Sequence, residues 1–204
     1  MLGEHAPEAR VLAGGQSLVP MMNFRLARPT VLVDLNRVAD LAYIRDDGDH
    51  LAIGAMTRER TIENSDLVRQ ACPLLHDATL NIAHLPIRTR GTIGGSIANA
   101  DPAAEYPATV LALDATLVAH SVRGERRIAA ADFFDGVLST TLEPDEILTE
   151  IVVPKPPAGS GAASCCTTHS PADEAGGVLA LTTRDTRVAS SKVSSGTGPC
   201  ESIA

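Results

Sequence analysis

The sequence predicts an α+β fold, in which short strands and helices alternate from Val11 to Val153. Short apolar runs, typical of strands, recur along this stretch and end at glycine, proline or aspartate turns. Helix start signals such as Pro73 lie between these runs. The 204 residues are 44% hydrophobic and 21% charged, which indicates one globular domain or two small ones.

The first half of the chain contains four expected strands and three expected helices. The strands are 11–13, 31–33, 41–45 and 50–53, and the last two form a hairpin around the turn 46–49. The helices are 58–64, with Thr57 as its N-cap, then 65–71, and a third that Pro73 opens and that continues through Ile82.

The second half begins with an expected loop, 88–101, because Gly91, Gly94 and Gly95 interrupt it. Residues 101–105 are expected to form a turn. A helix is expected to start near Pro107 and run to Leu113, because proline inside a helix loses a hydrogen bond. A second hairpin, with strands 117–120 and 127–129, and a last strand, 147–153, complete this part.

The composition changes after Pro157. Residues 158–163 are alanine, glycine and serine alone, and from Gly161 onward six of 44 residues are Ile, Leu, Val or Phe. This share lies below the roughly 20% that accompanies a packed core. We therefore expect a domain at 1–157 and a divergent tail of low order at 158–204, in which 178–181 is the one candidate strand.

The charge balance argues against several partner classes. The formal charge is 17 − 25 = −8, and no Lys/Arg run could follow a phosphate backbone, so we expect no nucleic acid partner. No apolar stretch approaches the roughly 20 residues of a membrane span. The N-terminus lacks a secretory pattern, which predicts a cytoplasmic protein.

Cys165, Cys166 and His169 lack the second cysteine pair of a zinc site, and the cysteines do not form an iron–sulfur motif, so no metal is expected.

Two glycine-rich segments are the candidate binding elements. They are Ala13-Gly14-Gly15-Gln16-Ser17 and Thr92-Ile93-Gly94-Gly95-Ser96. Paired glycines permit positive φ and close approach of backbone N–H groups to an anion, and Ser17 or Thr92 would add a hydroxyl donor. The same glycines also suit simple tight turns, and the residues alone leave both readings open. Neither segment matches the Rossmann or P-loop pattern.

Several strings resemble the flavin subunit of molybdenum-containing hydroxylases. They are LAGGQSLVP (12–20), RLA (25–27), VDL (33–35), IGAMT (53–57) and TIGGSIANADP (92–102). The resemblance is closest to the medium subunit of aerobic carbon monoxide dehydrogenases, and the FAD domain of xanthine dehydrogenases is also similar. It is collinear from about residue 8 to 160.

The resemblance implies the FAD-binding fold of the vanillyl-alcohol oxidase type, with FAD between two α/β subdomains. These would be about 1–38 and about 39–157. By this analogy the pyrophosphate lies between two sets of residues: Ala13, Gly14, Gly15, Gln16, Ser17 and Leu18 on one side, and Thr92, Ile93, Gly94, Gly95 and Ser96 on the other. Glu105 would bind the ribose, with Asp101 in the same loop, and Leu148 would contact the flavin or adenine region. Ser96 stands where many relatives have Asn, and the resemblance implies no catalytic side chain.

The function implied is an oxidoreductase subunit that takes electrons from the iron–sulfur clusters of a partner subunit. A molybdenum-cofactor subunit would oxidise the substrate, and FAD would deliver the electrons to an external acceptor. A truncated or frameshifted non-catalytic remnant and a stand-alone flavoenzyme on the same fold are the alternatives. The family's first strand is expected to be missing. The resemblance is expected to end after Ala163, where Ser164-Cys165-Cys166 replace the family's aromatic residue, lysine and C-terminal domain.

Overall fold

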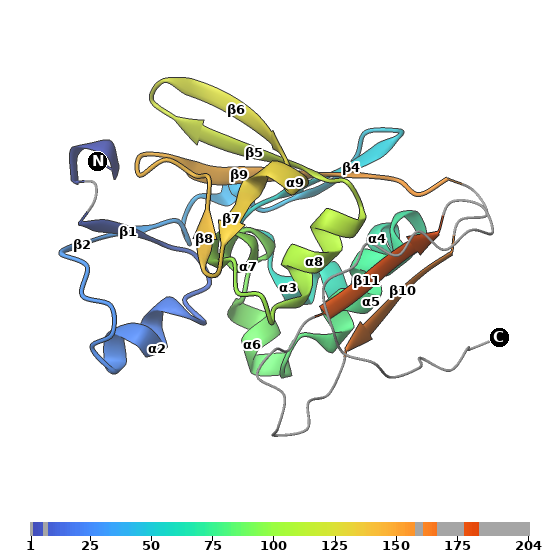
Figure 1. Ribbon diagram of the computed structural model, residues 1–204, viewed down its shortest axis with the longest axis horizontal. Coiled ribbons are helices and arrows are strands. Elements are labelled where there is room, and N and C mark those ends of the chain that lie inside the picture. The colour runs from blue at the N-terminus through green and yellow to red at the C-terminus, as the bar shows by residue number, and fades with distance from the viewer. Residues whose placement is uncertain (1, 6–7, 158–160, 167–177, 184–204) are drawn as a thin grey trace.

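The computed structural model describes residues 2–5, 8–157, 161–166 and 178–183. A five-stranded antiparallel sheet has helices packed against one face, and a smaller unit built on two parallel strands lies beside it (Figure 1). The described chain is thus a mixture of helix and sheet, as the sequence predicts.

The large sheet has the strand order β3-β4-β9-β5-β6, in which every neighbouring pair is antiparallel. Its strands are β3 (Ile44–Asp46), β4 (His50–Gly54), β9 (Ile147–Pro154), β5 (Thr116–Ser121) and β6 (Gly124–Ala129). The β3–β4 and β5–β6 pairs confirm both expected hairpins, and β9 confirms the last expected strand.

In the described part of the chain, six helices between β4 and β5 lie on one side of the sheet (Figure 1). They are α3 (Glu59–Glu63), α4 (Asp66–Ala71), α5 (Pro73–Asn81), α6 (Leu85–Arg90), α7 (Ile93–Asn99) and α8 (Glu105–Ala112). The core lies between them and the strands, and it includes the fully buried side chains of Leu51, Ile62, Leu75, Tyr106 and Ile151. The Tyr106 hydroxyl is satisfied at 2.9 Å from Thr79 Oγ1, so this phenol adds apolar area without an unpaired polar group.

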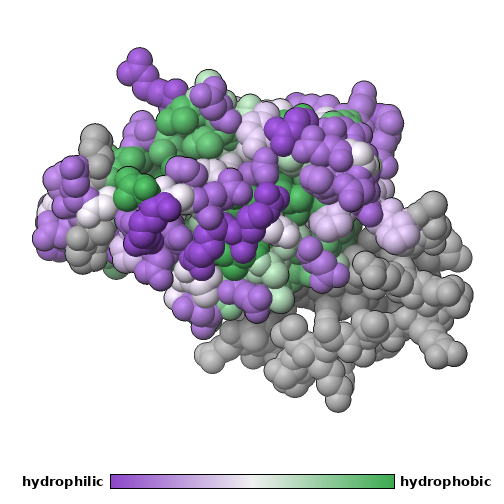
Figure 2. Space-filling view, turned by 90° about the horizontal axis from the view of Figure 1, so that it is seen from above, coloured by the Kyte–Doolittle hydropathy of each residue, from purple (hydrophilic) through white to green (hydrophobic). Residues whose placement is uncertain are grey.

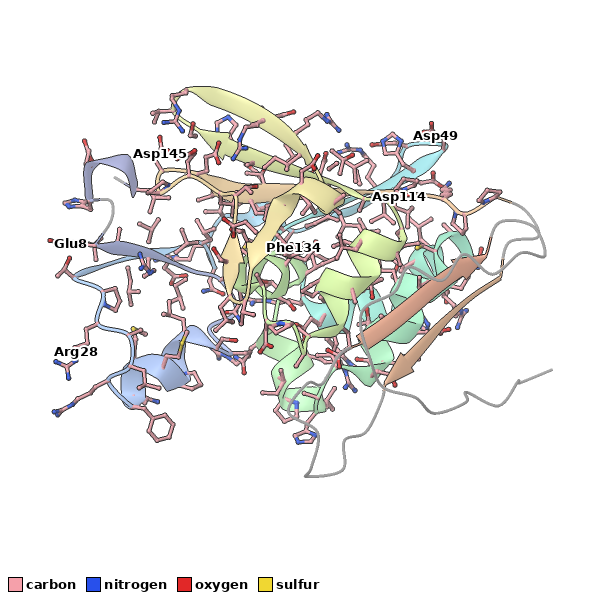
Figure 3. The ribbon with its side chains drawn as sticks, viewed as in Figure 1. Glu8, Arg28, Asp49, Asp114, Phe134 and Asp145 are labelled. Atoms are coloured by element: carbon pink, nitrogen blue, oxygen red, sulfur yellow. The ribbon has the colours of Figure 1, made fainter. Side chains whose placement is uncertain are left out.

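The smaller unit contains the strands β1 (Ala9–Leu12) and β2 (Val31–Asp34), which pair in parallel with Ala9 opposite Val31. The short helices α1 (Leu2–His5) and α2 (Leu18–Asn23) belong to it, and a 3₁₀ turn at Ala39–Leu41 leads to the large sheet. The Thr30 hydroxyl donates to Glu8 Oε2 at 2.9 Å and ties the two strand entrances together. Figure 3 labels Glu8 at this edge and shows Arg28 pointing away from the body of the protein.

The remaining elements lie at the edges of the fold. Below the sheet, α9 (Ala130–Phe133) leads into β7 (Phe134–Gly136), which pairs with β8 (Ser139–Thr140). The strands β10 (Gly161–Cys166) and β11 (Val178–Thr183) form an antiparallel pair that lies against α5 and α8 (Figure 1). The sequence predicts a strand at 178–181, and β11 includes it; β10 was not expected. The rest of the segment expected to be of low order lies outside the described residues.

Three sequence expectations about helices are wrong. Residues 88–101 contain the second half of α6 and all of α7, because Thr92 caps α7 and Gly94 packs closely against Ala55. Helix α8 begins at Glu105, so Pro107 lies in the first turn, where its missing N–H costs no bond. Thr57 does not cap α3: its hydroxyl donates to the Tyr43 carbonyl at 2.9 Å.

One face of the molecule is mostly polar. Seen from above, polar side chains cover much of the molecule and apolar ones gather in smaller patches between them (Figure 2). Asp49 and Asp145 lie at the rim of the large sheet (Figure 3), and Asp145 accepts from the Arg123 guanidinium at 2.8 Å. None of the described helices is long and apolar enough to cross a membrane.

Candidate functional site

The first glycine-rich segment connects β1 to α2, and its two glycines serve different purposes. Gly15 has φ +73°, a left-handed conformation that glycine adopts without strain. Gly14 allows a close approach: a Cβ on it would lie 2.4 Å from the Arg90 carbonyl oxygen and 2.8 Å from Gly91 Cα. A larger residue at position 14 would therefore push this segment away from the turn before α7.

The backbone of this segment presents unpaired donors. Within the described part of the chain, the N–H groups of Gly14, Gly15, Gln16 and Ser17 have no acceptor. Gln16 folds back so that its side-chain amide donates to the Gly14 carbonyl at 2.9 Å. Ser17 is exposed, and its hydroxyl does not cap α2. Successive free N–H groups beside a positive-φ glycine are suited to binding an anion.

The second glycine-rich segment is the first turn of α7, and its backbone donors are mostly engaged. The N–H of Ile93 donates to the Thr57 carbonyl at 3.2 Å, and that of Gly94 donates to the Ala55 carbonyl at 2.9 Å. The N–H of Gly95 donates to Thr92 Oγ1 at 3.1 Å, which makes Thr92 the N-cap. These hydrogen bonds hold the segment in place, and we call residues Thr92 to Ser96 the wall of the site. The Thr92 hydroxyl oxygen accepts in the cap, so its proton is not used there.

The structure brings the two segments into contact. A Cβ on Gly95 would lie 3.1 Å from the Ala13 Cβ, so the first turn of α7 lies directly beside the end of β1. Figure 1 shows this meeting point between the smaller unit and the helices. Ser96 is half-buried in the next position of α7, and Leu18 is half-buried at the start of α2.

Asn36 and Arg58, which we call the interloop pair, form hydrogen bonds that connect the first glycine-rich segment to the end of α6. The Arg58 guanidinium donates to Asn36 Oδ1 at 2.7 Å and also to the Arg90 carbonyl. The Asn36 amide donates to the Ala13 carbonyl at 2.8 Å. Burial lowers the pKa of Arg58, and the nearby Arg90 adds to this effect. A cavity of about 160 Å³ adjoins the pair and is also lined by Tyr43 and Met56.

Asp101 and Glu105 lie after α7, at the loop that leads into α8. Asp101 Oδ1 accepts from the N–H of Ala103 at 2.9 Å, and Glu105 is the first residue of α8. Burial raises the pKa of Glu105, and the like charge of Asp101 contributes. Neither carboxylate is paired with a lysine or arginine in the described residues, so both can accept hydrogen bonds from a ligand hydroxyl.

Leu148 is placed differently from the other expected residues. It lies on β9 with 5% of its surface exposed and belongs to the hydrophobic core. The neighbouring Thr149 carbonyl accepts from Ala55, the residue against which Gly94 packs, so Leu148 lies one strand position from the α7 contact. Leu148 shares this core with Ile93 of the second glycine-rich segment, and β9 packs against α7.

Metal ligands and residues without a local sequence signal complete the description of the site. The described residues contain no cluster of three or more His, Cys, Asp or Glu that could hold a metal ion. The side chains of Cys165 and Cys166, and the whole of His169, lie outside the described part of the chain. The interloop pair and the buried Glu59 were missed by sequence reasoning, because no local pattern distinguishes them.

Together these residues fit the pyrophosphate of a dinucleotide such as FAD. The first segment supplies free N–H donors, and the glycines leave room for a ligand to approach the backbone. Asp101 follows α7 in the chain, and Glu105 is the first residue of α8, which packs against α7.

Comparisons with known proteins give a consistent result. The family described as "FAD binding domain in molybdopterin dehydrogenase" matches residues 1–156. The chain is 47% identical over 163 residues to the 6-hydroxypseudooxynicotine dehydrogenase complex subunit alpha of Paenarthrobacter nicotinovorans, covering 80% of this chain and 55% of that protein. It is 39% identical over 189 residues to the nicotine 6-hydroxylase medium subunit of the same organism, covering 93% of this chain and 67% of that protein.

A solved structure agrees with these matches. A chain of the carbon monoxide dehydrogenase from Hydrogenophaga pseudoflava superposes with a TM-score of 0.85 at 39% identity, covering 91% of this chain and 65% of that one. The chain spans about half the length of the first curated relative (55%). A match over 93% of 204 residues must continue past residue 163, so the expectation that the resemblance ends there is wrong for the nicotine 6-hydroxylase subunit.

Proposed function

The chain belongs to the family of FAD binding domains in molybdopterin dehydrogenases, and on this premise we propose that it forms the FAD-binding part of an oxidoreductase subunit in a molybdenum hydroxylase complex. The family match confirms the resemblance seen in the glycine-rich strings and supports FAD as the cofactor. The proposed fold detail is the vanillyl-alcohol oxidase arrangement, with FAD between the smaller unit and the large sheet domain.

The observation that carries the proposal is the first glycine segment with its unpaired N–H groups, held against the turn before α7. In the proposed complex, Gly14 to Ser17 bind the pyrophosphate, and the wall from Thr92 to Ser96 fixes its position. Glu105 accepts a hydrogen bond from a ribose hydroxyl, and Asp101 supports the same loop. Bound FAD supplies the redox chemistry, while the protein binds and orients it.

The proposed partners are an iron–sulfur subunit, which passes electrons to FAD, and a molybdenum-cofactor subunit, which oxidises the substrate. The relatives' names indicate different substrates, among them nicotine and carbon monoxide, although they share this domain. This supports a substrate site on another subunit, so no side chain of this chain is assigned a catalytic role. A cytoplasmic location stays a prediction.

The test is a titration of the purified full chain with FAD, followed by quenching of flavin fluorescence and by retention of flavin absorbance after desalting. We expect saturable binding of one FAD per chain. The Gly14→Ala variant should bind more weakly, because its Cβ would lie 2.4 Å from the Arg90 carbonyl oxygen. Failure of the unaltered chain to retain FAD would contradict the proposal.

The partner assignment needs a separate experiment. Co-expression with the proposed iron–sulfur and molybdenum subunits, followed by affinity purification through one of those subunits, should recover this chain with bound FAD. Recovery of the partner subunits alone would contradict the assignment even if the isolated chain binds FAD.

A further inference from the structure

A buried carboxyl group lies behind the two glycine segments. Glu59 is the first residue of α3 and is 4% exposed. Its Oε2 atom has no hydrogen-bond partner within the described residues. A Cβ on Gly91 would lie 2.5 Å from Glu59 Oε1, so the carboxyl packs directly against the Gly91 backbone. An uncharged carboxyl tolerates this apolar contact far better than a carboxylate does.

Gly91 connects this carboxyl to the candidate pyrophosphate site. A Cβ on Gly14 would lie 2.8 Å from Gly91 Cα, so Gly91 touches both Gly14 and Glu59. Gly14 also carries one of the unpaired N–H groups of the first segment. The Glu59 N–H donates to the Gly91 carbonyl at 3.1 Å, which holds the start of α3 to the same glycine.

The charged and titratable groups that face Glu59 do not neutralise it. Arg88 on α6 is engaged with Glu63 at 3.0 Å, and Glu105 on α8 adds a like charge. Tyr106 on α8 is buried, and its hydroxyl is paired with Thr79 at 2.9 Å. Burial and, to a lesser extent, the like charge of Glu105 raise the pKa of Glu59, Arg88 opposes them, and the resulting pKa is about 7.

We propose that Glu59 is a positioning residue for the cofactor's pyrophosphate, which binds tightly when the Glu59 carboxyl carries a proton and weakly when that proton has been lost. The neutral carboxyl packs against Gly91, and Gly91 in turn packs against Gly14, so the carboxyl helps to hold Gly14 in position. A carboxylate at this place repels the phosphates across Gly91 and is drawn toward water. Binding of FAD therefore favours proton uptake by Glu59. This inference rests on the proposed function, because FAD is its ligand.

The first test is the FAD affinity of the full chain at about pH 6 and about pH 8.5, at fixed ionic strength. Because bound phosphate raises the pKa of Glu59, affinity falls as pH rises; a rise of about one unit corresponds to about tenfold weaker binding at the higher pH. Glu59→Gln should bind with the same affinity at both values. Glu125→Gln, a change of an exposed glutamate on β6, should keep the wild-type profile.

The second test needs no variant and so holds even if Glu59→Gln does not fold. Titration calorimetry of the unaltered chain with FAD, near neutral pH in two buffers of different ionisation enthalpy, should show uptake of part of a proton. No uptake, or equal FAD affinity at both pH values, would overturn this inference alone. An equal loss of affinity with pH in Glu59→Gln would do the same. Absence of FAD binding at every pH would overturn the proposed function together with it.

Discussion

Arg58 donates a 2.7 Å hydrogen bond to Asn36, and this contact joins the smaller unit to the helical layer. Each partner also binds one glycine-rich region: Asn36 donates to the Ala13 carbonyl, and Arg58 donates to the Arg90 carbonyl. The relative position of the two segments therefore depends on side chains that need not touch the cofactor.

The interloop pair should contribute to FAD affinity through this positioning. We expect Arg58→Ala and Asn36→Ala each to weaken FAD binding by about tenfold, and the pair to show a coupling of about 1 kcal/mol, because they share one hydrogen-bonded network. Arg58→Lys should bind FAD hardly more tightly than Arg58→Ala does, since an ammonium lacks the planar fork that donates to two acceptors at once. A double-mutant cycle on the FAD dissociation constant measures the coupling. Additive effects would contradict a linked pair, and Arg69→Ala, an exposed arginine on α4, is the control.

Gly14 should be intolerant of any side chain. Gly14→Ala forces backbone to move, because the new Cβ would lie 2.4 Å from the Arg90 carbonyl oxygen, and we expect a loss of about 1–3 kcal/mol in the free energy of unfolding. The matched control is Gly136→Ala, where the nearest atom to the new Cβ would lie 3.8 Å away. Urea unfolding measures both variants, and equal stabilities would show that the close approach at Gly14 is unimportant.

Thr92 should serve both the helix and the site. Thr92→Ala removes the cap of α7, which costs about 1 kcal/mol in unfolding free energy, whereas Thr92→Ser keeps the hydroxyl. Ser65→Ala is the matched control, since Ser65 caps α4 by accepting from Val68 at 3.2 Å. Both alanine variants should lose similar stability, but the Thr92 variant alone should also lose FAD affinity. A similar loss of affinity in Ser65→Ala would indicate a general effect of destabilisation.

Local sequence signals predict the parts of the fold that local interactions determine. The aspartate-rich turn at 46–49 predicts the β3–β4 hairpin, and Pro73 predicts the start of α5. The helix expected at 65–71 is α4, and Ser65 is its N-cap. In each case the residue that signals the element makes its defining contact within a few positions of the chain.

Contacts between distant segments account for the failures. Glycines at 91, 94 and 95 suggest a loop, but Gly94 is required because a Cβ there would lie 2.4 Å from the Ala55 Cβ. Asn36 and Arg58 are 22 residues apart, and nothing in their neighbourhoods indicates that they meet. The sequence therefore identifies which segments form the candidate site, whereas the residues that hold the segments together become visible in the fold.

Glu146 should control stability in acid. The Arg126 guanidinium donates to it at 2.6 and 3.0 Å and holds the pKa of this buried carboxyl below its usual 4.5, with help from the Glu143 N–H. Since the unfolded chain takes up the proton first, this stabilisation is present above pH 4.5 and is lost as pH falls through the lower folded value.

Glu146→Gln should lower the free energy of unfolding near neutral pH by about 1–3 kcal/mol. The difference from the wild type should shrink as pH falls below 4.5. Thermal or urea unfolding across this range measures it, and Glu125→Gln should stay within about 0.5 kcal/mol of the wild type. A difference that persists unchanged in acid would contradict the ion pair as its source.

Glu59 should have the opposite effect on stability, independently of any cofactor. Because burial raises its pKa from 4.5 to about 7, the folded chain retains a proton that the unfolded chain has released between these values. The contribution of Glu59 to the free energy of unfolding is therefore most favourable below pH 4.5. It falls by up to about 3 kcal/mol as pH rises to 7. The free energy of unfolding of the cofactor-free chain should show this slope, and Glu59→Gln should lack it. The same slope in both proteins would mean that another group titrates in this range, and that Glu59 is charged or solvated in the folded chain.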